Sequence, residues 1–166
     1  RNASLGAYGS AAQWVVILFM FLGGVNFSLH YFALRGHLTR YLRSEEFLFY
    51  ALVLAGGAGL MLIFNSGARD LGFGAQLRHA VFQAVSICTT TGFCTDDFGR
   101  WPTVSQVVLL VLMFVGGCSG STAGGFKCVR VLLLVKHAHV QLFRLVHPHA
   151  VRHVKVDYKL VPQAVM

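Results

Sequence analysis

Apolar residues follow one another along this chain in long runs that contain no charged side chain, and short basic or glycine-rich segments separate these runs. Three of these runs, free of Asp, Glu, Lys and Arg, cover residues 14–34, 47–64 and 101–126. A helix needs roughly 20 residues to cross the hydrocarbon core of a bilayer, and each run has about that length. The pattern therefore predicts three helical membrane segments.

Small and polar residues inside the first two runs indicate helices packed in a bundle. Gly23, Gly24 and Asn26 interrupt the first run, and a lone amide in a membrane usually faces another helix or a water-filled path. Residues 56–59 give the second run a stretch of small side chains for close packing. Ser44, Glu45 and Glu46 before this run are typical of a helix start, because a hydroxyl can cap the helix and carboxylates suit its first turn.

A fourth apolar segment, residues 77–89, is compatible with a helix but too short to span a bilayer. It leads directly into Thr90-Thr91-Gly92-Phe93, which has the form of a potassium-channel filter, where backbone carbonyl oxygens replace the hydration shell of the ion. Irregular backbone at membrane depth is tolerated only where it lines water or is buried in protein. The segment therefore predicts a re-entrant pore helix followed by a filter loop.

The residue types of this loop suit a cation path. Gly92 can adopt backbone angles that turn successive carbonyls to one side. We expect the Thr90 hydroxyl to add an oxygen beneath the carbonyls and Phe93 to wedge the strand against neighbouring helices. Asp96 and Asp97 follow, and at the outer mouth of a pore they would raise the local concentration of cations.

A second motif interrupts the last apolar run. It consists of Gly116, Gly117, Cys118, Ser119, Gly120, Ser121, Thr122, Ala123, Gly124 and Gly125. Five glycines and three hydroxyl residues in ten positions disfavour a regular helix, so we expect a break at mid-membrane. A run of small residues for helix packing is the alternative. A nucleotide-binding P-loop is not favoured, because Phe126 stands where that motif requires lysine.

Composition and charge agree with a membrane protein. Hydrophobic residues make up 55% of the chain, charged residues 12%, and the mean hydropathy is +0.62. The net charge is +8, and the cations gather at residues 35–43 and 127–159. Excess lysine and arginine mark cytoplasmic loops, so both regions are expected to face inward, with residues 65–100 outside or dipping into the membrane. Nucleic acid is the alternative partner for the basic tail, but membrane topology explains its charge more simply.

The chain offers no catalytic constellation. Cys88, Cys94, Cys118 and Cys128 form no C-x-x-C pair and have no histidine at zinc-finger spacing, and we expect reduced thiols in membrane segments. The tail histidines at 137, 139, 147, 149 and 153 diverge on a helix, which disfavours a metal site. No Ser/His/Asp set, Cys/His set or paired carboxylates stand at recognisable spacing, so we predict neither an enzyme nor an organic cofactor.

Taken in order, the motifs resemble one family. They are Thr89-Thr90-Thr91-Gly92-Phe93, Asp97-Phe98, Trp101-Pro102 and the segment 113–127. This combination resembles the third repeat of the Trk/Ktr/HKT superfamily of potassium transporters. The resemblance implies an all-α integral membrane fold with a helix, a re-entrant pore helix plus filter loop, and a broken helix. Residues 1–43 would close the preceding repeat, 44–136 would form one repeat, and 137–166 would be a basic cytoplasmic link toward the next.

The resemblance also implies a function. In this family four such repeats surround one pore, so Thr90 to Phe93 would supply a quarter of the potassium filter, and the loop 116–125 would gate it from below. It implies a multi-pass protein of the inner membrane, surrounded by lipid and paired as a homodimer, with a cytoplasmic nucleotide-binding regulatory subunit. Phe126 departs from the smaller aliphatic residue expected there. A non-transporting membrane scaffold is the alternative function. Preference for potassium over sodium, and coupling to protons or sodium, depend partly on the other repeats.

The chain begins at Arg1 and ends shortly after a basic segment, without the charged start and cleavage site of a signal peptide. We therefore expect a fragment of a longer polypeptide.

Overall fold

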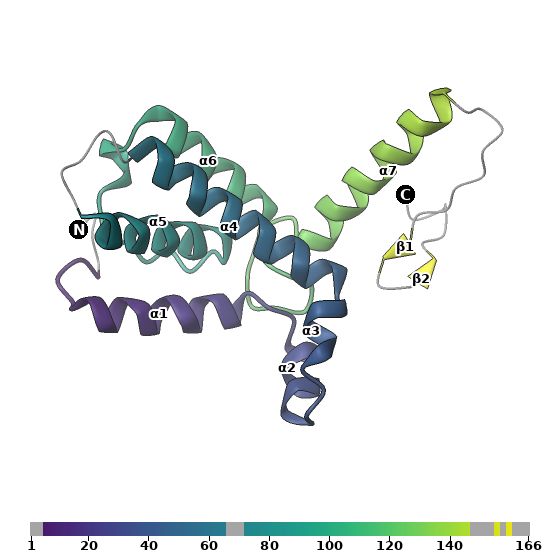
Figure 1. Cartoon of the computed structure of the whole chain (residues 1–166), viewed down its shortest axis with the longest axis horizontal. Helices are drawn as coiled ribbons and strands as arrows, with labels where there is room; N and C mark the ends of the chain where they lie inside the picture. Colours follow the sequence, from purple (N-terminus) through teal and green to yellow (C-terminus); the bar gives the residue numbers. More distant parts are fainter. Residues whose placement is uncertain (1–4, 66–71, 147–154, 157–158, 161–166) are drawn as a thin grey trace.

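The computed structural model describes residues 5–65, 72–146, 155–156 and 159–160, and these are mostly helical. Four helices pack side by side in a bundle (Figure 1): α1 (Ser10–Gly23), α4 (Glu45–Asn65), α5 (Phe73–Cys88) and α6 (Thr103–Val115). The last helix, α7 (Cys128–Val146), leads away from this bundle. The predicted all-helical fold is confirmed for this part of the chain.

Helix α4 matches the predicted second membrane segment. The Ser44 hydroxyl accepts a hydrogen bond from the Phe47 amide at 3.4 Å, and Glu45 and Glu46 occupy the first turn, where carboxylates favour the helix dipole. At the other end, Asn65 Oδ1 accepts a hydrogen bond from the Ser105 hydroxyl of α6 at 3.0 Å. Within the described residues, α4 alone is long and apolar enough to cross a membrane as one unbroken helix.

The first apolar run does not form one continuous helix, so the prediction of a single helix over residues 14–34 is wrong. Helix α1 ends at Gly23, and α2 (Phe27–Leu34) starts at an angle of 103° to it. Asn26 is the reason on the α2 side, because its Oδ1 accepts a hydrogen bond from the Ser28 amide at 2.9 Å and so caps α2. On the α1 side, Gly24 lies against the Tyr50 side chain with no room for a Cβ atom.

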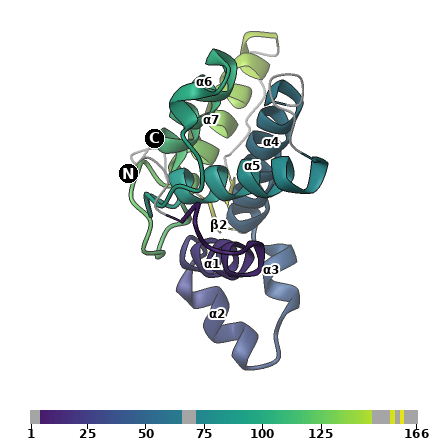
Figure 2. The same cartoon turned by 90° about the vertical axis from the view of Figure 1, so that its left-hand side faces the viewer.

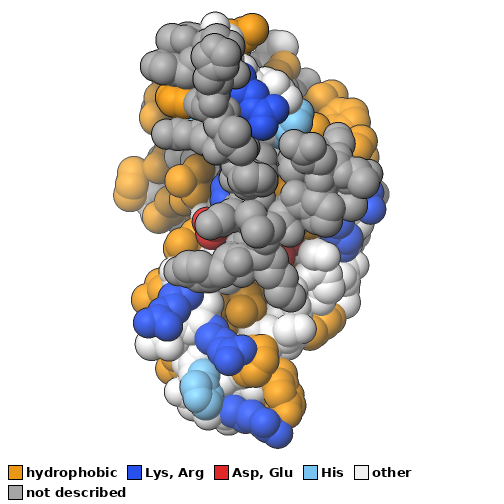
Figure 3. Space-filling view, turned by 90° about the vertical axis from the view of Figure 1, so that its right-hand side faces the viewer, with side chains coloured by type: hydrophobic (Ala, Val, Ile, Leu, Met, Phe, Trp, Pro, Cys, Tyr) orange, Lys and Arg blue, Asp and Glu red, His pale blue; other side chains and the backbone are white. Residues whose placement is uncertain are grey.

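Helices α2 and α3 (Thr39–Arg43) together form a pair set crosswise to α1 at one end of the bundle (Figure 2). Arg35, Arg40 and Arg43 are exposed on it, and the space-filling view shows cationic side chains gathered at this end (Figure 3). The Arg35 and Arg40 guanidinium carbons lie 4.6 Å and 3.7 Å above the rings of Tyr31 and Phe32. The predicted basic segment is therefore a structured surface of arginine and aromatic side chains.

The bundle is apolar on its outside as well as in its core. Leu18, Leu52, Ile63 and Met113 are 55%, 69%, 67% and 62% exposed. An exterior of this kind suits contact with lipid or with further membrane helices. Inside, a Cβ atom on Gly57 would come within 2.8 Å of Leu112 of α6, whereas Gly56 and Gly59 face open space. Only part of the expected small-residue stretch therefore serves close packing among the described helices.

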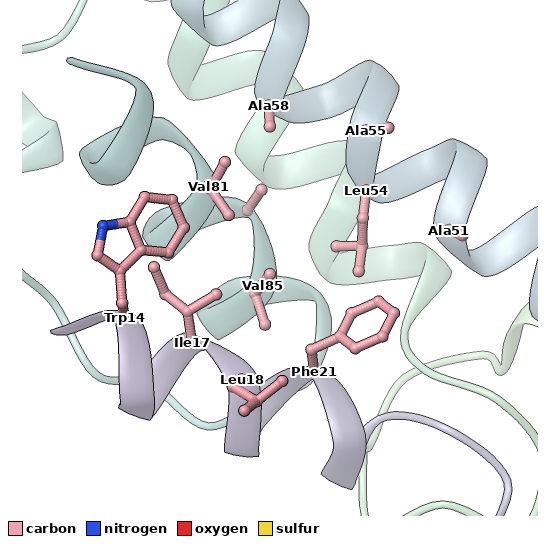
Figure 4. A pocket seen from close by; sticks show the side chains of 11 residues that line it. Trp14, Ile17, Leu18, Phe21, Ala51, Leu54, Ala55, Ala58, Val81 and Val85 are labelled. Carbon is pink, nitrogen blue, oxygen red and sulfur yellow. The ribbon is translucent and has the colours of Figure 1, made fainter. Parts of the chain in front are cut away.

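An apolar pocket of about 380 Å³ opens between α1, α4 and α5 (Figure 4). Its lining comes from aliphatic, alanine and aromatic side chains, among them Trp14, Ile17, Leu54 and Val85. Such a lining offers a cation no oxygen ligand, so this pocket does not extend the candidate filter.

The basic tail carries a small element that the sequence did not predict. Strands β1 (Lys155–Val156) and β2 (Lys159–Leu160) pair antiparallel, with Lys155 opposite Leu160. His137 and His139 lie on α7, while the predicted tail histidines at 147, 149 and 153 fall outside the described residues.

Candidate functional site

Helix α5 occupies the centre of the bundle and delivers the chain to the candidate filter. It contacts α1, α4 and α6, and Phe82, Gln83 and Ser86 on it are fully buried. It starts at Phe73, earlier than the sequence indicated, but its 16 residues still fall short of the roughly 20 that a bilayer requires. A buried helix that is too short to span the bilayer is what a re-entrant pore helix needs.

The chain leaves the helical conformation directly after α5. Thr90 has φ 56° and Gly92 has φ 79°. Both lie in the left-handed region, which residues other than glycine and asparagine rarely adopt. The Thr90 amide donates to the Ile87 carbonyl at 3.1 Å and the Thr91 amide to the Ser86 carbonyl at 3.0 Å. The N–H groups of this segment therefore point back to the end of α5.

The carbonyl groups of the segment are used differently. No donor among the described residues reaches the Thr90 or Thr91 carbonyl oxygens, and Thr90, Thr91 and Gly92 are exposed. The Phe93 carbonyl, in contrast, accepts a hydrogen bond from the Ser86 hydroxyl at 2.6 Å. The Phe93 ring is 44% exposed, so the described helices only partly provide the wedge that we expected of it.

Asp96 and Asp97 hold the chain that follows the filter segment. One Asp96 carboxylate oxygen accepts a hydrogen bond from the Trp101 indole at 3.0 Å and the other from the Asp97 amide at 2.8 Å. Asp97 caps the short helix η1 (Phe98–Arg100) by accepting from the Gly99 amide at 3.1 Å, and it lies 3.6 Å from the Arg100 guanidinium. Both carboxylates thus have structural partners in addition to the charge expected at an outer mouth.

The glycine-rich segment forms the predicted break, since α6 ends at Val115 and α7 begins at Cys128. We call residues 116–127 the loop. Its Cys118 amide donates to the Gly24 carbonyl at 2.9 Å, and its Thr122 amide donates to the Gly23 carbonyl at 3.2 Å. The bend between α1 and α2 therefore leaves the Gly23 and Gly24 carbonyls available to accept hydrogen bonds from the loop.

Sequence reasoning missed the part that Glu46 plays at the loop. Glu46 is only 6% exposed, and its Oε1 accepts a hydrogen bond from the Ser119 amide at 2.5 Å. The sequence signal was a carboxylate at the edge of an apolar run, which we assigned only to the start of α4. The Gly116 carbonyl is similarly occupied, because the buried thiols of Cys88 and Cys128 both donate to it at 3.1 Å.

The loop and the filter segment meet directly. The Gly124 amide donates a hydrogen bond to the Thr90 hydroxyl at 2.7 Å, and a Cβ atom on Gly124 would come within 3.2 Å of the same oxygen. Two motifs that the sequence separates by more than twenty residues are thus in contact, with the loop against the end of the filter segment that adjoins α5.

Comparison with known proteins decides the family. The profile of the TrkH family, described as a cation transport protein, matches residues 1–166. This chain belongs to the TrkH family. It is 41% identical to the "Trk system potassium uptake protein TrkH" of Halomonas elongata over 99% of this chain. It is 37% identical to the Escherichia coli protein of the same name over 100% of this chain. In both cases the chain spans 35% of the relative.

The structural comparison gives the same result for the TrkH fold. The crystal structure of the potassium transporter TrkH from Vibrio parahaemolyticus superposes with a TM-score of 0.90 at 35% sequence identity, over 99% of this chain and 36% of that one. The predicted family resemblance and the all-helical membrane fold are both confirmed.

Proposed function

We propose that this chain forms part of a potassium uptake pore in which Thr90, Thr91 and Gly92 supply backbone carbonyls to the ion and Phe93 ends the filter segment. The observation that carries the proposal is the backbone between α5 and η1. Its N–H groups are turned toward α5, while the carbonyls of Thr90 and Thr91 lack a donor among the described residues. Carbonyls held in this way can replace the water around a potassium ion.

The position of α5 favours a cation over an anion as the ion in the proposed pore. The carboxyl end of α5 adjoins the filter segment, and a helix carries partial negative charge at that end. Asp96 and Asp97 add two carboxylates on the far side of the segment. Both features favour positive charge along the path.

The loop is the second element of the proposed pore. Residues 116–125 lie against the Thr90 end of the filter segment, where they would obstruct an ion that has passed the filter. We infer that the loop gates the pore from below. Its many hydrogen bonds to the α1–α2 bend and to Glu46 are polar contacts that can break and reform without disturbing the apolar core.

The remaining functional assignments concern the whole protein. One filter segment contacts an ion from one side only. A complete ring of carbonyls therefore requires equivalent segments from other repeats of the same polypeptide. We propose residues 44–136 as one such repeat, 1–43 as the close of a preceding one and 137–166 as a link. The proposal places the protein in the inner membrane as a multi-pass homodimer, with the basic tail near a cytoplasmic nucleotide-binding subunit. The assigned groups bind an ion and perform no chemistry on it, and potassium is cargo.

The filter assignment is tested by replacing Gly92 with serine in the full-length protein. Gly92 has φ 79° but open space around its Cβ position, so the substitution strains the backbone without creating a clash. Reconstituted vesicles should then lose most of the preference for potassium over sodium. A potassium preference equal to that of the unaltered protein would refute the assignment. Gly72→Ser, which also has open space but an ordinary φ of −58°, is the matched control.

A further inference from the structure

One peptide unit of the loop is held from both sides by side chains. Lys127 Nζ donates to the Ala123 carbonyl, and the amide of the next residue, Gly124, donates to the Thr90 hydroxyl at 2.7 Å. The carbonyl and the N–H of the Ala123–Gly124 peptide are therefore both engaged. The Thr90 hydroxyl in turn donates to the Thr89 carbonyl at 2.7 Å. A continuous hydrogen-bonded path thus runs from a lysine ammonium in the loop through Thr90 of the filter segment to the carboxyl end of α5.

The backbone at both ends of this path is unusual. In the described part of the chain, Thr90 and Lys127 are the two non-glycine residues with positive φ, at 56° and 73°. Such angles are energetically costly for residues other than glycine and persist only where surrounding contacts enforce them. The side chains of both strained residues bind the same peptide unit. Thr90 accepts from its N–H on Gly124, and Lys127 donates to its carbonyl on Ala123.

The lysine charge strengthens the whole path. An ammonium at the Ala123 carbonyl polarises the peptide, which makes the Gly124 N–H a better donor to Thr90, since hydrogen bonds in series polarise one another. Lys127 also reaches the Ser121 carbonyl at 3.4 Å. It thus occupies a group of loop carbonyls in the manner of a tethered cation.

We propose that Lys127, the Ala123–Gly124 peptide and Thr90 form a latch that holds the loop closed against the filter, and that a potassium ion at the innermost filter position competes with this latch for the Thr90 hydroxyl. The inference rests on the proposed function. With the loop closed, that hydroxyl accepts from Gly124 and donates to Thr89. A cation beside the same oxygen would lie next to the positive end of the Gly124 N–H dipole, so the ion and the closed loop disfavour each other. Lys127 is a positioning residue in this scheme, since it acts on the filter through the peptide.

Cys118 provides a native reporter of the latch that does not depend on conduction. It belongs to the loop, and its side chain is fully buried, so release of the loop should expose its thiol. The experiment measures alkylation of Cys118 by N-ethylmaleimide in the full-length protein, quantified by peptide mass spectrometry in sodium medium. Thr90→Val and Lys127→Met each remove one end of the latch, and each should accelerate alkylation about fivefold to tenfold, the effect of losing one hydrogen bond.

Four comparisons separate a latch from general loosening. Thr90→Ser keeps the hydroxyl and should label at the unaltered rate. Arg130→Met removes the same charge three residues from Lys127, at an exposed side chain, and should also leave the rate unchanged. The double variant Thr90→Val/Lys127→Met should label no faster than the faster single variant, because both changes open the same path. Potassium in place of sodium should accelerate labelling of the unaltered protein but not of Thr90→Val.

The opposite results overturn the latch. One is a wild-type labelling rate in Thr90→Val with an unchanged melting temperature. Another is a double variant whose labelling accelerates by the product of the two single effects. The third is an unaltered protein that labels at the same rate in sodium and in potassium. These outcomes are distinct from failure of the proposed function. A protein whose ion selectivity depends on Gly92 but whose Cys118 labelling ignores Thr90 keeps the pore and loses the latch, and the reverse result keeps the latch and loses the pore.

Discussion

At the scale of single residues, the candidate filter depends on side chains that bind its backbone from behind. The Ser86 hydroxyl holds the Phe93 carbonyl at 2.6 Å, and Gln83 Nε2 holds the Asp96 carbonyl at 3.1 Å. Both side chains are fully buried on α5. A buried donor that loses its acceptor costs more than an exposed one, so these two residues fix the end of the filter segment at Phe93 and the chain that follows it at Asp96.

Replacing Ser86 with alanine tests this support. The Phe93 carbonyl would lose its donor and become free to rotate, so the full-length protein should keep potassium flux but discriminate less well against sodium, as measured by competition in vesicles. Ser105→Ala is the matched control, because Ser105 is also fully buried and also donates one hydrogen bond, to Asn65. Both changes should lower stability by about 1 kcal/mol. Equal selectivity in the two variants would show that the Ser86 hydrogen bond does not support the filter segment.

Glu46 offers a second prediction at this scale. Its carboxylate accepts from the Ser119 amide, so Glu46→Ala should weaken the docking of the loop and raise basal potassium flux in vesicles. Glu45→Ala, one residue earlier, removes an exposed carboxylate that pairs with Lys136 at 2.5 Å, and exposed pairs contribute little. Basal flux should therefore rise in the first variant and stay constant in the second. If both variants respond alike, the Glu46 contact with the loop does not matter for gating.

At the scale of elements, the bend between α1 and α2 and the loop form one unit. The Gly23 and Gly24 carbonyls accept from the loop, and the Gly120 carbonyl accepts from the Phe27 amide at 3.1 Å. The loop could not dock in this way on a continuous helix, where those carbonyls would bind amides four residues further along. The structure of α1 and α2 is thus set by a segment almost a hundred residues later in the chain.

This dependence explains which elements could be predicted from the sequence. Helix α4, the short α5 and the break after Val115 follow from local patterns: an apolar run with a Ser44 cap, a run too short to span, and a cluster of glycines. The bend at Gly24 does not follow from the apolar run, because beside the local Asn26 cap it involves tertiary contacts with Cys118 and Thr122. The role of Glu46 could not be predicted for the same reason, because its partner Ser119 is far away in the sequence. At the candidate site, the filter segment and the loop were foreseen as motifs, but their contact through Thr90 required the fold.

Gly24→Ala tests the bend as an element. A Cβ atom there would lie 2.7 Å from Thr89 and would also collide with the Tyr50 hydroxyl, so we expect a loss of about 1–3 kcal/mol from overpacking and a lower melting temperature in detergent. Gly56→Ala places a methyl group in open space within α4, and alanine favours a helix by roughly 0.5–1 kcal/mol over glycine. The Gly56 variant should therefore melt at or above the temperature of the unaltered protein. Equal melting temperatures for the two variants would contradict the tight packing at Gly24.

At the scale of the whole molecule, two hydrogen-bonded contacts define the ends of the bundle. The ion pair of Lys136 with Glu45 places α7 beside the start of α4, near the arginines of the α2–α3 pair. The Ser105–Asn65 bond places the start of α6, and with it η1, at the end of α4. The cationic side chains of α2 and α3 thus share an end with the basic start of α7. Since lysine and arginine accumulate on the cytoplasmic side of membrane loops, this end should face the cytoplasm and η1 should face outward.

A labelling experiment on intact cells tests this orientation in the full-length protein. Leu38→Cys lies between the arginines of the α2–α3 pair and is 65% exposed, while the Arg100 side chain on η1 is 81% exposed. A membrane-impermeant thiol reagent should label Arg100→Cys in intact cells and Leu38→Cys only after permeabilisation, with the unaltered protein giving the background from its native cysteines. Loss of the exposed Arg100–Asp97 pair should not disturb the fold, because such pairs contribute little. Labelling of Leu38→Cys in intact cells would invert the orientation, and with it the assignment of Asp96 and Asp97 to the outer mouth and of the loop to the inner side of the filter.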